Sequence, residues 1–178
     1  TDTDGNYVDA GKGDDYVYGS DKNDTLKAGD GNDFVWTMGG NDTVYGGKGH
    51  DALVAEAGGS STLYGEKGND LIEIKYDGDV AYGGDGDDEL HVGYKDIDTS
   101  VYGTEIDATI YGGKGNDVIS IFTGGATVNG EAGNDVIYGS RTAASNIVFA
   151  KGGGNDVYKH MGQADVLVFD KINASSLS

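Results

Sequence analysis

Carboxylates recur along this sequence at a nearly constant interval. Asp15, Asp33 and Asp51 are evenly spaced, and Asp70 and Asp88 continue the row with a single extra residue before Asp70. Carboxylate and carbonyl oxygens are the ligands that calcium prefers, about six to eight for each ion. The chain has no cysteine, so it offers no thiolate ligand for a softer metal. The recurring carboxylates therefore predict calcium sites rather than zinc sites.

A nine-residue unit carries these carboxylates. From Thr1 the chain divides into six consecutive blocks, TDTDGNYVD, AGKGDDYVY, GSDKNDTLK, AGDGNDFVW, TMGGNDTVY and GGKGHDALV. Place six of every block is Asp or Asn, and place eight is Val or Leu. Glycines, common at places two and four, permit positive φ and a tight path on which several carbonyl oxygens can converge. Each block is expected to combine an oxygen-rich turn with a short strand.

The last three places of a block should alternate outward, inward and outward, as in a β-strand. Two blocks make one coil, and place eight supplies a line of core aliphatics. Later members of this line are Leu63, Ile72, Ala81, Leu90, Ile110, Ile119, Val128 and Ile137. The sequence therefore predicts an all-β parallel β-roll, a β-solenoid of about nine coils, with calcium between stacked glycine-aspartate loops.

Charge and composition exclude several other classes of protein. The formal net charge is −19, which would repel nucleic acid. Cations are therefore the expected partners of this chain. No apolar run is long enough to span a membrane. The sequence contains neither an HExxH nor a GxSxG motif, and His50, His91 and His160 lie in repeat blocks or their continuation. We therefore expect no enzyme in this segment.

Three features leave alternatives open. One edge of the roll should carry Asp24 and Asp42 but lose its metal in the block of residues 55–63, where Ser60 lies near the place of the next carboxylate. The segment 92–111 breaks the period, through either an extra coil with a bulged loop or a change of the metal-bearing edge.

Aromatic residues also recur at the coil spacing. Tyr45, Tyr64 and Tyr82 should stack as an outward ladder, and Tyr102, Tyr111 and Phe149 should continue it. The simpler interpretation is that this ladder covers the surface of the strands, and the alternative is that it binds a ligand.

Several blocks resemble the RTX (repeats-in-toxin) nonapeptide GGxGxDxUx, where U is a large aliphatic residue. GGKGHDALV, GGDGDDELH and GGKGNDVIS match it at every fixed place. The resemblance covers residues 1–159, with irregular stretches at 92–111 and 139–150, and residues 160–178 resemble incomplete capping strands at the end of such arrays. It implies a right-handed parallel β-roll that binds calcium, about five to eight ions in this chain.

The resemblance also implies the ligands. The carboxylate ligands would be Asp15, Asp24, Asp33, Asp42, Asp51, Asp70, Asp88, Asp117, Asp135 and Asp156. Glycines at places two and four would supply carbonyls, at Gly11, Gly13, Gly29, Gly31, Gly47, Gly49, Gly68, Gly84, Gly86, Gly113, Gly115 and Gly133. Met38, Glu66 and Glu131 replace glycine at place two, which puts ion occupancy of their loops in doubt.

By this resemblance the segment is a secreted, extracellular module of a larger parent chain. It would fold on binding calcium outside the cell, support export by the type I secretion machinery, and scaffold a toxin or other virulence factor that engages a host-cell surface. The alternatives are a stalk or ligand-binding module of an RTX adhesin, or an accessory module of an exported enzyme.

Overall fold

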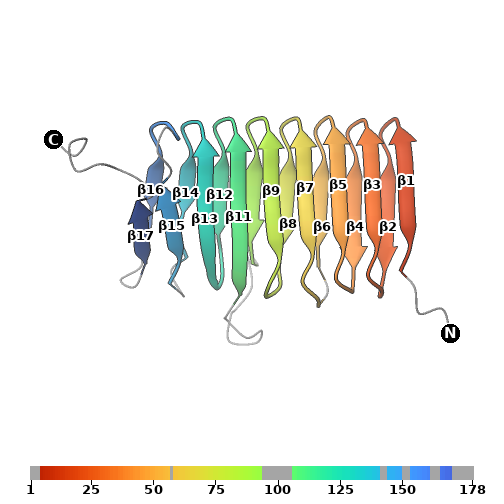
Figure 1. Ribbon diagram of the computed structural model, residues 1–178, viewed down its shortest axis with the longest axis horizontal. Coiled ribbons are helices and arrows are strands. Elements are labelled where there is room, and N and C mark those ends of the chain that lie inside the picture. Colours follow the sequence, from red (N-terminus) through yellow and green to blue (C-terminus); the bar gives the residue numbers. More distant parts are fainter. Residues whose placement is uncertain are drawn as a thin grey trace.

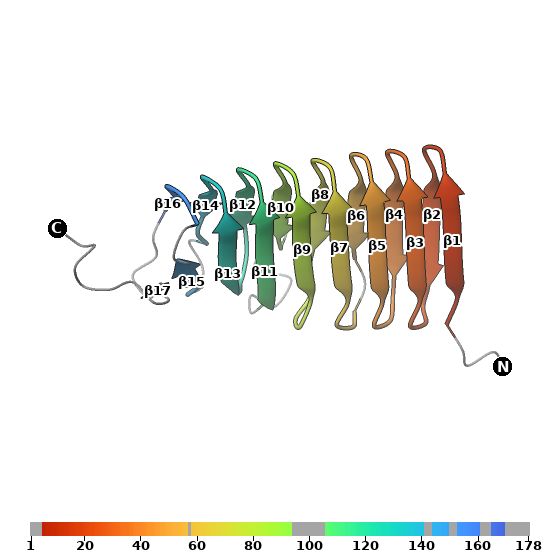
Figure 2. The ribbon, with the colours of Figure 1, turned by 45° about the horizontal axis from the view of Figure 1, so that its top comes forward.

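The computed structural model describes residues 5–56, 58–93, 106–140, 144–149, 153–160 and 165–169, which form strands, turns and no helix. Accordingly, no described segment is a helix that could cross a membrane. The strands form two parallel sheets of nine and eight strands that lie face to face (Figures 1 and 2). We call them the odd sheet and the even sheet, after the numbers of their strands.

Consecutive strands alternate between the two sheets. The odd sheet contains, in order, β1 (Tyr7–Lys12), β3 (Thr25–Asp30), β5 (Thr43–Lys48), β7 (Thr62–Lys67), β9 (Val80–Asp85), β11 (Asp107–Lys114), β13 (Gly125–Ala132), β15 (Asn146–Phe149) and β17 (Val166–Phe169). The even sheet contains β2 (Tyr16–Ser20), β4 (Phe34–Met38), β6 (Ala52–Ala55), β8 (Leu71–Ile74), β10 (Glu89–Val92), β12 (Val118–Ile121), β14 (Val136–Tyr138) and β16 (Val157–Lys159).

Each strand therefore pairs with the strand one full coil later. In Figure 1 the chain runs up the nearer odd sheet and down the farther even sheet as it advances from the N-terminal to the C-terminal end, so the roll is right-handed. The predicted all-β parallel roll of about nine coils is confirmed, as eight two-strand coils and a ninth strand of the odd sheet.

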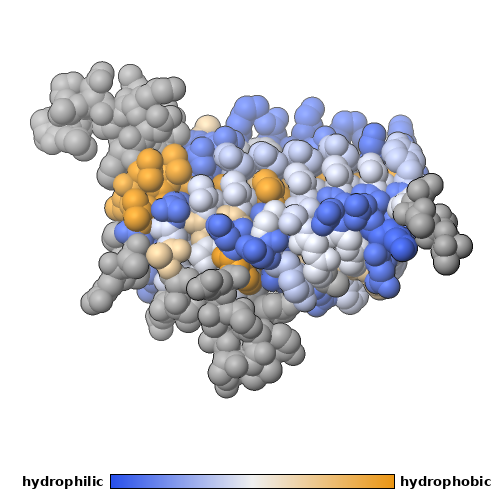
Figure 3. Space-filling view, turned by 60° about the horizontal axis from the view of Figure 1, so that its bottom comes forward, coloured by the Kyte–Doolittle hydropathy of each residue, from blue (hydrophilic) through white to orange (hydrophobic). Residues whose placement is uncertain are grey.

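The core lies between the sheets and consists of aliphatic side chains that both sheets contribute. Place-eight residues such as Leu63, Ile72 and Leu90 are fully buried, as the period of the sequence predicts. Figure 3 shows apolar surface at the C-terminal end of the roll, where Val157, Val166 and Val168 are 46%, 51% and 41% exposed.

The register of the odd sheet places the irregular segment. Tyr7 of β1 pairs with Thr25 of β3, two blocks later, whereas Val80 of β9 pairs with Thr109 of β11, across a longer stretch of chain. In the even sheet β10 pairs with both β8 and β12, so no strand intervenes. The break in period is therefore neither an extra coil nor a change of edge, because the additional residues lie in the connection from β10 to β11. Of that connection, residues 94–105, with Tyr102, lie outside the described residues.

Candidate metal sites

The loops that lead from each odd strand to the next even strand form one edge of the roll, which is the top edge in Figure 1 and is called here the upper edge. Each loop follows place two, which is glycine in most blocks but Glu66 or Glu131 in two of them. It turns at places four and five and ends at the place-six aspartate before the next strand. The upper edge carries Asp15, Asp33, Asp51, Asp70, Asp88, Asp117, Asp135 and Asp156. The recurring carboxylates thus lie on one edge, as the sequence predicts.

From Asp33 onward, one oxygen of each carboxylate in this row holds neighbouring coils together. The backbone N–H of Asp51 donates to Oδ1 of Asp70 at 2.9 Å, and that of Asp70 donates to Oδ1 of Asp88 at 2.8 Å. The row continues across the irregular segment, because the N–H of Asp88 donates to Oδ1 of Asp117 at 2.9 Å. Each of these hydrogen bonds therefore sets the distance between the loop of one coil and the loop of the next.

The second oxygen of these carboxylates is buried and accepts no hydrogen bond. This is the state of Oδ2 in Asp15, Asp33, Asp51, Asp70, Asp88, Asp117 and Asp135 of the upper edge, and also in Asp42 of the opposite edge. A buried carboxylate oxygen without a partner is costly, and a bound cation is the usual compensation. The carboxylates of the upper edge therefore fit a metal ion that neutralises them.

Backbone carbonyls converge on the same buried oxygens. A Cβ at Gly65, place one of its block, would overlap both Oδ2 of Asp70 and the carbonyl oxygen of Gly83 in the next coil. The same cradle recurs at Gly83, between Oδ2 of Asp88 and the carbonyl oxygen of Gly112. A carboxylate and a carbonyl oxygen that face one space are the donor set of a hard cation such as calcium.

The place-one glycines line this cradle, and the sequence-based ligand set omits them, since it names glycines at places two and four. The sequence does mark these residues, because place one is the first glycine of the GGxGxD pattern. Among the described residues no group of three or more His, Cys, Asp or Glu side chains gathers to hold a metal. A calcium ion at this edge would therefore depend on backbone carbonyls for much of its coordination.

Place-four glycines bring successive loops into contact. Gly49 and Gly68 have φ values of 128°, and a Cβ at Gly68 would overlap the carbonyl oxygen of Gly49. Side chains at place five add a second ladder, in which the N–H of His50 donates to Oδ1 of Asn32 at 2.8 Å. His50 Nδ1 in turn accepts from the N–H of Asn69 at 2.9 Å, so this histidine is part of the loop stack.

The opposite edge, called here the lower edge, carries Asp24 and Asp42, and then departs from the prediction. Ser61, not Ser60, occupies the next place in register, and its Oγ accepts from the N–H of Asp42 at 3.2 Å. Asp79 then restores a carboxylate, whose Oδ1 accepts from the N–H of Ser61 at 2.8 Å. The sequence reading missed Asp79 because the loop before it, at residues 75–78, lacks the glycine pattern of the other blocks.

The lower edge suits metal less well than the upper edge. Both oxygens of Asp79 are used, because Oδ2 accepts from the N–H of Tyr76 at 3.1 Å. Asp24 likewise accepts from the N–H of Ser20 at Oδ2, at 2.6 Å. Among the lower-edge aspartates of the described residues, Asp42 alone has a buried oxygen without a partner. Metal at this edge is expected at Asp42 first.

Burial raises the pKa of the stacked carboxyl groups, and the charge of neighbouring aspartates raises it further. The pKa reaches about 7 at Asp117 and about 6 at Asp51, Asp70, Asp88 and Asp135. Without metal these groups bind protons when the chain folds. Their contribution to stability is therefore fully present below about pH 4 and is lost as the pH rises through the folded-state values.

The metal-free chain should accordingly be more structured in acid than at neutral pH. We expect far-ultraviolet circular dichroism in excess chelator to show more β-structure at pH 4.5 than at pH 8, because protonation removes the repulsion between stacked carboxylates. A spectrum that is independent of pH over this range would mean that the carboxylates do not limit folding of the metal-free chain.

A family model of the RTX calcium-binding nonapeptide repeat, of four copies, matches residues 1–21, 18–53, 57–73, 76–93, 102–120 and 122–141. These segments span well over half of the sequence. The chain belongs to the RTX calcium-binding repeat family. Among curated proteins no match is found. Repeats of this family typically belong to exported proteins.

RTX membership gives the stacked loops their chemistry. The chain is a calcium-binding repeat module, and the resemblance seen in GGKGHDALV and its sister blocks is confirmed. The buried Oδ2 atoms and glycine carbonyls of the upper edge are the groups that would hold calcium there. The individual ligands, and the number of about five to eight ions, stay predictions.

Proposed function

We propose that this RTX module is a calcium-responsive folding unit of an exported protein. It stays unfolded where calcium is scarce, passes in that state through a type I secretion channel, and folds outside the cell into a rigid roll. There it scaffolds the remainder of a larger secreted toxin or virulence factor that engages a host cell. It carries out no catalysis itself.

The row of buried, unpartnered carboxylate oxygens along the upper edge supports this proposal above any other observation. Oδ2 of Asp51, Asp70 and Asp88 lies within the stack of loops, away from water and without a hydrogen bond. Each additional coil brings another charge into the row. Stacking of the coils is therefore unfavourable at neutral pH until a cation enters, which couples folding to metal.

The net charge and the small core also destabilise the folded state in the absence of calcium. The chain carries 31 Asp and Glu residues and 12 Lys and Arg residues, so repulsion between negative charges destabilises the compact state. The core between the two sheets is narrow: β12 buries only Ile119 and Ile121, and the shorter β14 buries only Ile137. Apolar burial on this scale gives little excess stability to offset the repulsion.

A calcium titration followed by far-ultraviolet circular dichroism tests the proposal. We expect a cooperative transition from coil to β-structure, with a midpoint of roughly 10⁻⁴–10⁻³ M as in other extracellular calcium modules. Magnesium at the same concentrations should produce no such transition, because it prefers a small octahedral site and retains its waters.

Two results would contradict the proposal. A β-rich spectrum in chelator at neutral pH, unchanged by calcium, would show that folding does not need the ion. A midpoint near roughly 10⁻⁷ M, the lowest calcium dissociation constants of intracellular sensor proteins, would allow the module to fold before export.

A further inference from the structure

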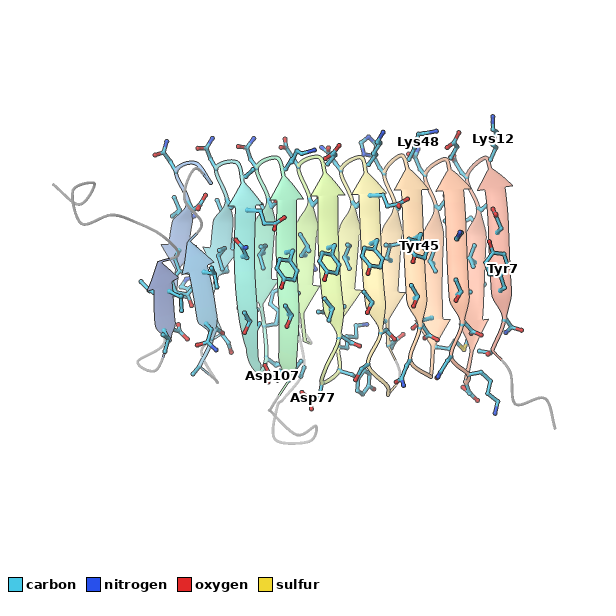
Figure 4. The ribbon with its side chains drawn as sticks, viewed as in Figure 1. Tyr7, Lys12, Tyr45, Lys48, Asp77 and Asp107 are labelled. Carbon is cyan, nitrogen blue, oxygen red and sulfur yellow. The ribbon has the colours of Figure 1, made fainter. Side chains whose placement is uncertain are left out.

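A shallow groove of about 760 Å³ crosses the outer face of the odd sheet from β1 to β9. Part of its floor is backbone, because Gly29 and Gly47 occupy adjacent outward positions and leave the sheet bare there. Glu66 follows in the same row and separates Gly47 from Gly84. Tyr45 stands on one side of this floor and Lys48 on the other, as Figure 4 shows. The volume lies within the range of ordinary ligand sites, roughly 300–1,000 Å³.

A stacked row of tyrosines begins at the wall of the groove. The ring centroids of Tyr45, Tyr64, Tyr82 and Tyr111 are 5.1, 4.9 and 4.8 Å apart in succession, and their planes are parallel within 7°. The predicted ladder is thereby confirmed for these four residues. Each ring covers the face of the next, so the row offers ring edges and hydroxyls, not an open face on which a flat ligand could stack.

The charged groups of the groove alternate in sign. Lys48 pairs with Asp30 at 2.7 Å, and Lys27 lies 5.6 Å from the ring centroid of Tyr45. The full set of charged lining residues is Asp9, Lys27, Asp30, Lys48, Glu66, Lys67 and Asp85. Hydrogen-bond donors and acceptors are thus interleaved along the groove with little net charge. An acidic polymer would meet four carboxylates there, whereas a hydroxyl group can both donate and accept.

We propose that this groove binds a linear, uncharged oligosaccharide that lies along the axis of the roll. The coil repeat of about 4.8 Å is close to the length of one sugar unit in an extended chain, so β1 to β9 would hold about four units. Lysine and tyrosine would donate to sugar hydroxyls, carboxylates would accept, and the glycine floor would contact the apolar faces of the sugars. The inference rests on the proposed function, since the groove exists only in the folded roll.

Binding of defined hexasaccharides to the calcium-loaded chain tests the proposal. Cellohexaose, laminarihexaose and maltohexaose serve as neutral probes and a hexauronate as the acidic comparator, each titrated by isothermal calorimetry. The groove variant is Lys27→Met with Tyr45→Phe. Its matched control is Lys159→Met with Tyr138→Phe on the even sheet, where the lysine ammonium lies 5.0 Å from the tyrosine ring centroid.

We expect at least one neutral hexasaccharide to bind, the groove variant to weaken that binding about tenfold through lost hydrogen bonds, and the control to leave it unchanged. Absence of binding by all three neutral probes, tighter binding of the hexauronate, or equal binding by the two variants would overturn the proposal. Circular dichroism of each sample separates these outcomes from a failure to fold with calcium.

Discussion

Replacement of Asp70 by asparagine should remove one calcium ion from the folded roll. Asparagine keeps Oδ1, which accepts the N–H of Asp51 at 2.9 Å, but places an amide group where the buried, unpartnered Oδ2 lies. An amide nitrogen cannot ligate calcium. At a free calcium concentration of 100 times the dissociation constant, loss of one site lowers the free energy of unfolding by about 2.7 kcal/mol.

Chemical denaturation at fixed free calcium measures this effect, and calcium binding to the folded chain should fall by one ion. The matched control is Asp85→Asn, which removes the same charge from the same edge. Asp85 is exposed and paired with Lys114 at 2.7 Å, so its replacement should change stability by no more than about 0.5 kcal/mol. Equal losses in the two variants would show that general charge, not ligation, is responsible.

The same substitution should act differently without metal. The pKa of Asp70 is raised to about 6, chiefly by burial, so its charge opposes folding of the metal-free chain at neutral pH. The asparagine side chain is neutral and removes that opposition. In chelator, the Asp70→Asn variant should therefore have at least as much β-structure as the unsubstituted chain. If Asp70 served only to hold the fold together, its replacement would reduce the β-structure in chelator as well.

Replacement of Gly68 by alanine should disrupt the stack of loops itself. Gly68 has φ of 128°, a conformation that alanine rarely adopts, and a Cβ there would overlap the carbonyl oxygen of Gly49 in the preceding coil. Backbone strain and overpacking each cost about 1–3 kcal/mol, so we expect a loss of roughly 2–6 kcal/mol. Loss of the β-signal at saturating calcium, or a large fall in the denaturation midpoint, would be the readout.

Gly58→Ala is the control for this variant. Gly58 does not have a positive φ, and no heavy atom lies within 4 Å of a Cβ placed on it. Its substitution should alter stability by less than about 0.5 kcal/mol. If Gly68→Ala were as mild as the control, close contact between successive place-four glycines would not be a requirement of the roll.

The two glycine places differ in a way that the sequence did not reveal. Met38, Glu66 and Glu131 stand at place two with φ between 65° and 72°, in the left-handed region open to ordinary residues at modest cost. The loops of these blocks keep their path, and Oδ2 of Asp70 and Asp135 stays buried without a partner. The carboxylates of these two loops therefore have the same unpartnered buried oxygen as those of loops with glycine at place two, and the ion occupancy of the loops stays a prediction.

The sequence by itself determined the repeating parts of this protein. A nine-residue period places Leu63 and Ile72 inside and Asp70 and Asp88 on one edge, because two blocks close a coil and strand side chains alternate. Only the tertiary structure decided which coils are neighbours where the period breaks. Val80 pairs with Thr109 because hydrogen bonding between coils is non-local, so a longer stretch of chain between two strands does not shift their register.

The state of each carboxylate was likewise decided in three dimensions. Asp42 and Asp79 occupy the same lower-edge row, yet Asp42 keeps an unpartnered buried oxygen while Asp79 is satisfied by the N–H groups of Ser61 and Tyr76. Spacing predicts where an aspartate lies, but not which backbone groups reach its oxygens, since those come from loops whose local path varies. The groove beside Tyr45 also exists only because glycines from separate coils become neighbours on the folded sheet.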